Sequence, residues 1–211
     1  MPAETSQTLD RGLRTLHLLG ESPGGLTVTE LAGQLGVSRP VVYRLLGTLG
    51  QHGLVRRAED GRYRLGLGLL ALARRVQPLL RDAALPVLRA LAEEVGATAH
   101  LTVVDGGEAL AVAVVEPSWT DFHVAYRVGS RHALDRGAAG RAILAARDGH
   151  GPAYVVTVGE LQPGAHGVAA AIVGVTAVEA SVGVVTLGEL SADRVGPRVV
   201  KAAAALGHRL R

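Results

Sequence analysis

Apolar residues recur at helical spacing along the first fifty residues, and they predict three short helices. The first covers residues 8–20, with an apolar face formed by Leu9, Leu13, Leu16 and Leu19. The second begins at Thr27, which has the spacing of a capping box with Glu30, and it ends at Gly36. The third begins after the N-cap Ser38, and its inner face is formed by Val42, Leu45, Leu46 and Leu49.

The second and third helices, joined by a glycine turn, have the pattern of a helix-turn-helix. An ordinary helical hairpin with solvated arginines has the same spacing, so both interpretations stay open at this point. Two short strands around Asp60-Gly61 then predict a β-hairpin. A hairpin rich in arginine directly after a helix-turn-helix is typical of a wing that contacts DNA phosphate or the minor groove.

In the second half of the chain, the spacing of apolar residues changes from a helical to an alternating pattern. Residues 67–77 have a helical pattern that Pro78 is expected to interrupt, and a second helix is expected over residues 79–95. Period-two alternation then predicts strands. They cover residues 99–104, 110–116, 122–128, 154–158, 168–173 and 180–187. Helices are expected over residues 138–147 and 191–210, the latter with Ser191 as its N-cap.

An antiparallel sheet with helices at both ends of the segment predicts an α+β domain. We therefore expect an α+β chain of two domains. A winged helix-turn-helix head covers residues 1–66, a linker helix covers residues 67–78, and the second domain covers residues 79–211.

Several segments resemble the IclR family of bacterial transcriptional regulators. In the head they are residues 9–13 (Leu-Asp-Arg-Gly-Leu), 41–49, 53–55 and 63–66, the last followed by Leu-Leu-Ala-Leu at 69–72. In the second half they are residues 138–145, 159–170 and 181–188, which resemble the family's GAF-like effector domain. The resemblance implies a DNA-binding regulator with a small-molecule effector and a linker helix that helps the heads to dimerise.

The chain also departs from the family pattern. Pro40 and Val41 stand where the family usually has small hydroxyl residues, and the segment 147–153 is shorter than in the family. Thr157 stands near the position of an acidic residue in members that bind small acids. No lysine or arginine lies on the predicted inner strand positions after Arg127, so an anion would depend on backbone amides at the start of helix 138–147. We therefore expect an open or apolar pocket and a largely apolar or weakly polar effector.

Two sets of candidate residues follow from these patterns. The DNA-binding candidates are Ser38, Arg39, Tyr43, Arg44, Thr48, Arg56, Arg57, Arg62 and Arg64. The effector-binding candidates are Trp119, Phe122, Ala138, Ala139, Gly140, Thr157, Val168, Val184 and Thr186. Trp119, the only tryptophan, is expected to close over the ligand, although a tryptophan in a surface loop is an equally simple interpretation.

Charge and composition support the DNA-binding interpretation and exclude others. Residues 1–77 carry ten arginines and six acidic residues, a net charge of +4 within a chain total of +3. The chain has no cysteine, which excludes disulfides and thiolate metal sites and fits a cytoplasmic protein. No secretory signal is visible in residues 1–10, and no apolar run of membrane-spanning length occurs.

No catalytic motif accompanies the eight histidines. We therefore expect no enzyme, no metal site and no cofactor. The expected function is sequence-specific transcriptional regulation, as a repressor. The expected partners are double-stranded operator DNA, a small-molecule effector and a second copy of the chain, as a homodimer or a dimer of dimers, with no membrane. The alternative is a DNA-binding regulator whose second domain binds no ligand and serves assembly alone.

Overall fold

The structure is a computed structural model, and it describes residues 5–119, 126–147, 149, 151–176 and 178–211. The chain divides into two compact units, Met1–Gln77 and Pro78–Arg211, which are described separately. The predicted α+β class is confirmed, with a helical first unit and an antiparallel sheet in the second. No helix in these described ranges is long and apolar enough to cross a membrane.

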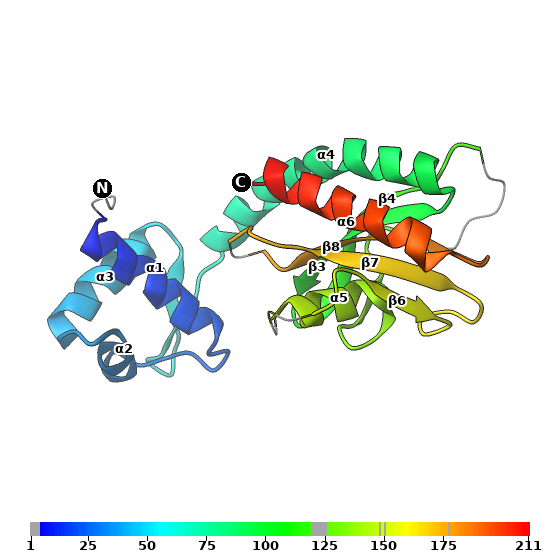
Figure 1. Ribbon diagram of the computed structural model, residues 1–211. Helices are drawn as coiled ribbons and strands as arrows, with labels where there is room; N and C mark the ends of the chain where they lie inside the picture. The colour runs from blue at the N-terminus through cyan, green and yellow to red at the C-terminus, as the bar shows by residue number, and fades with distance from the viewer. Residues whose placement is uncertain (1–4, 120–125, 148, 150, 177) are drawn as a thin grey trace. The chain divides into compact units, whose positions relative to one another are not determined.

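The first unit contains three helices and a two-stranded hairpin, as predicted (Figure 1). Its elements are α1 (Gln7–Gly20), α2 (Val28–Leu35), α3 (Arg39–Gln51), β1 (Val55–Arg57) and β2 (Tyr63–Leu65). The capping box of α2 is present, because Thr27 accepts from the Glu30 N–H while the Glu30 carboxylate accepts from the Thr27 N–H. The core is formed by Leu19, Leu26, Leu31, Leu35, Val42, Leu45, Leu46 and Val55.

The buried face of α1 differs from the predicted one. Leu9 and Leu13 are 62% and 50% exposed, whereas Gly12 and Thr15 are buried. Thr15 can occupy a core position because its hydroxyl donates to the Arg11 carbonyl at 2.8 Å, so no polar group is left unsatisfied. The helix is therefore rotated relative to the prediction, and two leucines remain on the surface.

The second unit is built on a six-stranded antiparallel sheet with helices on both faces (Figure 1). The strand order is β5-β4-β3-β8-β7-β6. The strands are β3 (Thr98–Asp105), β4 (Glu108–Val115), β5 (Arg131–Ala133), β6 (Val155–Val158), β7 (His166–Ile172) and β8 (Ala180–Thr186). The helices are α5 (Gly137–Arg147), α6 (Ala192–Arg209) and the second part of α4 (Gly68–Val95).

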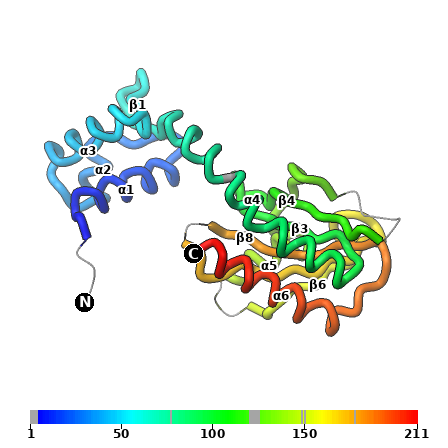
Figure 2. Tube along the Cα trace, turned by 90° about the horizontal axis from the view of Figure 1, so that it is seen from above, coloured from blue at the N-terminus to red at the C-terminus, as the bar shows by residue number. Residues whose placement is uncertain are grey.

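The two faces of the sheet carry different cores. On one face, α4 and α6 lie side by side and bury Leu101, Val168, Val182 and Val184 (Figures 1 and 2). On the other face, α5 packs through its alanines against Ala169. Successive side chains of a strand point to opposite faces, so adjacent residues of β7 and β8 serve different cores.

Several predicted details of the second unit were wrong. The expected interruption at Pro78 is absent: α4 continues through both Pro78 and Pro86, although each proline removes one hydrogen bond of the helix. The expected strand over residues 122–128 lies mostly outside the described residues, and residues 126–128 are not in a strand. Strand β5 was missed.

Two predicted helix caps are present in position only. Ser38 and Ser191 precede α3 and α6 with extended backbone, but neither side chain accepts a capping hydrogen bond.

Candidate DNA-binding surface and ligand pocket

Helix α3 presents one apolar and one polar face. Val42, Leu45 and Leu46 are buried against α1 and α2. The four candidates of this helix are exposed, as the periodicity predicted: Arg39, Tyr43, Arg44 and Thr48. Tyr43 is 59% exposed, and the Thr48 hydroxyl donates to the Arg44 carbonyl at 3.1 Å. A helix with this outer face is suited to lie in the major groove.

The four arginines of the hairpin fall into two pairs. Arg56 and Arg57 are exposed, and neither forms an ion pair with any residue that the structure describes. Arg62 donates to the Gly25 carbonyl at 2.8 Å and pairs with Glu30 at 3.1 Å. These bonds leave Arg56 and Arg57 as the hairpin cations with the most freedom to contact phosphate.

Arg64 is engaged in the same way as Arg62. It pairs with Asp60 at 2.6 Å and donates to the Gly24 carbonyl at 2.9 Å. The Asp60 side chain holds the pKa of the Arg64 guanidinium above its usual range, chiefly by accepting this hydrogen bond. Arg62 and Arg64 therefore tie the wing to the turn before α2, a role that sequence reasoning did not assign to them.

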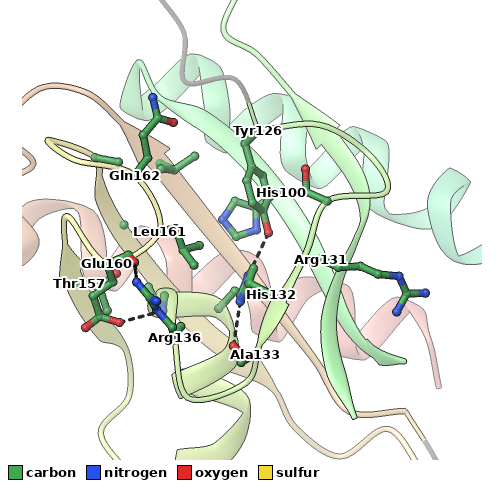
Figure 3. Close-up of a pocket in the computed structure, with 17 residues that line it drawn as sticks. His100, Tyr126, Arg131, His132, Ala133, Arg136, Thr157, Glu160, Leu161 and Gln162 are labelled. Atoms are coloured by element: carbon green, nitrogen blue, oxygen red, sulfur yellow. Dashed lines mark hydrogen bonds between the residues drawn. The ribbon is translucent and has the colours of Figure 1, made fainter. Parts of the chain in front are cut away.

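A pocket of about 450 Å³ opens in the second unit on the α5 side of the sheet (Figure 3). Its floor is formed by small residues at the start of α5 and by the strand pair Gly167 and Val185. One wall carries His100 and Tyr126, and the opposite wall carries Arg136, Glu160 and Leu161 (Figure 3). The volume lies within the range of small-molecule sites.

His100 and Tyr126 form the aromatic wall, and both side chains are uncharged. His100 is 5% exposed, and burial lowers the pKa of its imidazole to about 3. Burial also raises the pKa of the Tyr126 phenol above its usual value. The Nδ1 atom of His100 lies 3.1 Å from the Thr102 hydroxyl, and the Tyr126 hydroxyl lies 3.4 Å from Nε2 of His132. A network of hydrogen bonds thus fixes the rings at the wall.

Glu160 binds the start of helix α5. Its carboxylate accepts the Gly137 N–H at 2.8 Å and lies 3.3 Å from the Arg141 guanidinium, and its carbonyl accepts a hydrogen bond from Arg136. An internal carboxylate therefore already satisfies one of the backbone amides at the start of α5, where an anionic ligand was expected to depend on such amides.

Comparison with known proteins identifies both units. Residues 8–59 match the family model described as the IclR helix-turn-helix domain, and residues 76–166 match the bacterial transcriptional regulator IclR C-terminal domain. The chain belongs to the IclR family. The resemblance inferred from the sequence motifs is therefore confirmed.

Relatives within the IclR family are transcriptional regulators by name. The chain is 32% identical over 143 residues to the Transcriptional repressor IclR of Escherichia coli (strain K12), covering 66% of this chain and 52% of that protein. It spans about half the length of the curated relatives it matches. The names of these curated relatives denote transcriptional regulators and no enzyme, which agrees with the prediction that the chain is not an enzyme.

Solved IclR-family structures share the fold. The regulator from Brucella abortus superimposes with a TM-score of 0.56 at 22% identity, covering 99% of this chain and 94% of that chain. An IclR homologue from Microbacterium hydrocarbonoxydans, complexed with 4-hydroxybenzoate, gives a TM-score of 0.56 at 20% identity, covering 97% and 99%.

The structure gathers only some of the predicted effector residues at the pocket. Ala138, Ala139 and Thr157 line it. Val168 and Val184 do not, because they pair with each other and face the α4 and α6 core on the opposite side of the sheet. The neighbours Gly167 and Val185 line the pocket instead. In these two strands, the residues that face the pocket are therefore offset by one position from the predicted ones. Thr186 lies two residues after Val184 and is also outside the lining.

Two other predicted effector residues, Gly140 and Trp119, lie outside the pocket lining. Gly140 is buried against Leu134, where an added Cβ would lie 2.4 Å from the Leu134 carbonyl oxygen. Trp119 is 65% exposed and lies over Gly96, with its indole N–H donating to the Glu93 carbonyl at 3.2 Å. Phe122 lies outside the described residues.

Sequence reasoning missed most of the polar lining: His100, Tyr126, Arg131, His132, Arg136 and Glu160. The signal at His100 was its place within the strand pattern, but the other residues come from loops and from the three-residue strand β5, whose approach depends on the fold. The lining is more polar than the sequence led us to expect.

Proposed function

We propose that this chain is a DNA-binding transcriptional regulator that acts as a repressor. The observation that carries the proposal is the exposed polar face of α3 and two wing arginines that form no ion pair with any described residue, within a domain of IclR helix-turn-helix type. Ser38, at the start of α3, and Thr48 are proposed as further contacts. We place the end of the DNA-binding module near residue 66 and a linker over residues 67–78.

The test is titration of double-stranded DNA from the promoter beside its own gene, followed by fluorescence anisotropy over a salt series. Each phosphate contact is expected to contribute about 0.9 to the log–log salt slope. Scrambled DNA of the same length is the control for sequence specificity. An affinity that depends neither on salt concentration nor on DNA sequence would contradict the proposal. A reporter gene behind the same promoter checks the direction of regulation, and repression is expected.

We propose further that the pocket binds a small-molecule effector. Its volume, its ordered aromatic wall and its mixture of polar and apolar lining support this function. The homologue complexed with 4-hydroxybenzoate is a precedent for ligand binding within this fold. The alternative, a second unit that serves assembly alone, predicts that no small molecule changes its melting temperature or its affinity for DNA.

Self-association through the first unit is proposed as well. The leucines that α1 leaves exposed, together with Leu65, Leu67 and Leu70, form unpartnered apolar surface of the kind that a homodimer or a dimer of dimers would cover. Light scattering is expected to give at least twice the chain mass of 21.8 kDa. The double variant Leu9→Glu/Leu13→Glu is expected to lower that mass, and Leu187→Glu, at an exposed site of the second unit, is the matched control. A monomeric wild-type chain would exclude this assembly.

A further inference from the structure

Helix α6 carries a large share of the positive charge of the second unit. Residues 78–211 contain twelve lysines or arginines and thirteen acidic residues, a net charge of −1. Five of these cations lie in residues 194–211, which contain no aspartate or glutamate. Residues 78–193 therefore hold seven cations and thirteen acids, a net charge of −6. The helix is thus a basic element on an otherwise acidic domain.

The cations of α6 lie on the side of the helix that the domain leaves uncovered. Its inner side is buried in the core through Val195, Val199, Ala202, Ala203 and Leu206. Arg194, Lys201 and His208 follow one another at intervals of seven residues, which is close to two helical turns, and all three are exposed. Arg209 is exposed beside them. These four residues, which we call the basic face, extend over about 22 Å at about 1.5 Å per residue.

The basic face is not neutralised within the described part of the chain. Arg194, Lys201 and Arg209 form no ion pair with any described residue. Arg198 differs, because it pairs with Glu94 of α4 at 2.6 Å, and it is therefore not counted in the face. Three cations without a carboxylate partner thus lie on one side of a single helix.

Helix stability explains only part of this arrangement. A cation in the last turn interacts favourably with the helix dipole, and Arg209 is in that turn. Arg194 is in the first turn, where a positive charge is unfavourable, and Lys201 is in the middle, where the effect of the dipole is small. Helix formation therefore does not account for these two residues, whereas recognition of an extended anion does.

Double-stranded DNA is the extended anion that this chain is proposed to bind. It carries about one negative charge per 1.7 Å of its axis, so a basic face about 22 Å long can meet several phosphates. The chain connects the second unit to the head, and a head bound to DNA therefore holds α6 at a high local concentration of the same duplex. The pocket lies on the opposite face of the sheet (Figure 1), so DNA on α6 leaves the pocket residues free.

We propose that the basic face of α6 contacts the phosphate backbone of DNA that flanks the operator. The inference rests on the proposed DNA-binding function, and it adds a contact surface outside the winged helix-turn-helix. Phosphate contacts carry no direct sequence information, so this face raises the affinity for any flanking sequence and leaves the choice of operator to α3. An acidic surface on a second copy of the chain is the competing occupant, and the test distinguishes it.

The test measures the salt dependence of DNA binding by the full chain, using fluorescence anisotropy on two duplexes. One is the shortest promoter fragment that retains specific binding, and the other adds about 20 base pairs, two helical turns, at each end. Wild type is expected to give a steeper log–log salt slope on the long duplex. In Lys201→Gln/Arg209→Gln, the slope on the long duplex is expected to fall by about 0.9 for each lost contact, with little change on the short one.

The matched control is Arg141→Gln/Arg147→Gln. It removes the same charge from the same unit, but from two arginines of α5 that already pair with Glu160 and Glu179. Its slope is expected to equal that of wild type on both duplexes. Thermal unfolding of both double variants is expected at the wild-type temperature, because all four side chains lie on the surface.

The outcomes separate this inference from the proposed function. Equal slopes for wild type and Lys201→Gln/Arg209→Gln on the long duplex would overturn the inference, and so would an equal fall in the control. A lower mass by light scattering with an unchanged slope would assign the face to a second copy. If Arg56→Gln lowers the slope and the α6 variant does not, the proposed function stands and only the inference fails. A wild-type chain that binds neither duplex would overturn the proposed function itself.

Discussion

The imidazole ring of His100 lies against the phenol ring of Tyr126, with centroids 4.8 Å apart and ring planes inclined by 55°. The imidazole also lies close to the backbone of Gly183, because a Cβ on that residue would be 2.6 Å from the Cε1 atom of the ring. Burial lowers the His100 pKa to about 3, so the histidine is neutral in the folded chain and gains a proton in the unfolded chain below its ordinary value.

The second unit should therefore lose stability in mild acid. The unfolded state binds one more proton than the folded state between about pH 6.5 and pH 3, so the free energy of unfolding falls with decreasing pH by up to about 1.4 kcal/mol per unit. Asn at position 100 can keep a partner for the Thr102 hydroxyl but does not titrate. Denaturant unfolding at several pH values is expected to show a shallower acid loss in His100→Asn than in wild type. His208→Asn, at an exposed site of α6, should behave like wild type.

The wing arginines should separate by their effect on the salt dependence of DNA binding. Arg56→Gln and Arg57→Gln are each expected to weaken binding and to reduce the log–log salt slope by about 0.9, because each removes a phosphate contact. Arg62→Gln is expected to weaken binding without that loss of slope, because it releases the wing from Glu30 and Gly25. Anisotropy titrations over a salt series measure both quantities. A full loss of slope in Arg62→Gln would mean that this side chain leaves Glu30 to bind phosphate.

Substitutions at the N-caps of α2 and α3 should distinguish an effect on stability from an effect on DNA binding. Thr27→Ala is expected to destabilise the first unit by about 1 kcal/mol, because Thr27 accepts the Glu30 N–H at 3.2 Å. Ser38→Ala should change stability by less than about 0.5 kcal/mol, because its side chain makes no capping hydrogen bond. If Ser38 contacts DNA, its replacement lowers affinity all the same. Thermal unfolding and anisotropy on both variants give the comparison; a large loss of stability in Ser38→Ala would show an unrecognised cap.

Glycine at position 196 should be required by the ring of Tyr154. A Cβ there would lie 2.4–2.6 Å from three ring atoms, so Gly196→Ala is expected to cost about 1–3 kcal/mol. The double variant with Tyr154→Leu should recover part of that loss. In α2, a Cβ on Gly33 would meet no described atom within 4 Å beyond its chain neighbours and the backbone of its own helix, and Gly33→Ala is expected to stabilise the first unit by about 0.5–1 kcal/mol. Opposite signs for the same substitution, measured by thermal unfolding, would confirm the packing.

The sequence by itself determined the features that depend on neighbours a few residues apart. The capping box between Thr27 and Glu30, the glycine that ends α2 and the hairpin at Asp60-Gly61 each arise within four residues, because local hydrogen bonds and backbone preferences decide them. The outer face of α3 was also predictable, since its inner face is strictly periodic. These features are enough to define a winged helix-turn-helix.

Only the tertiary structure decided the pocket and the roles of the arginines. Val168, Ala169 and Ala170 are all buried, as are residues 180–184, so both faces of β7 and β8 are covered and burial alone does not fix which side faces the pocket. Arg62 pairs with Glu30, which lies 32 positions earlier in the chain, and the Glu160 carboxylate accepts a hydrogen bond from Gly137, 23 positions earlier. Pairings at such separations are set by how the elements pack together, and the periodicity of each element carries no information about them.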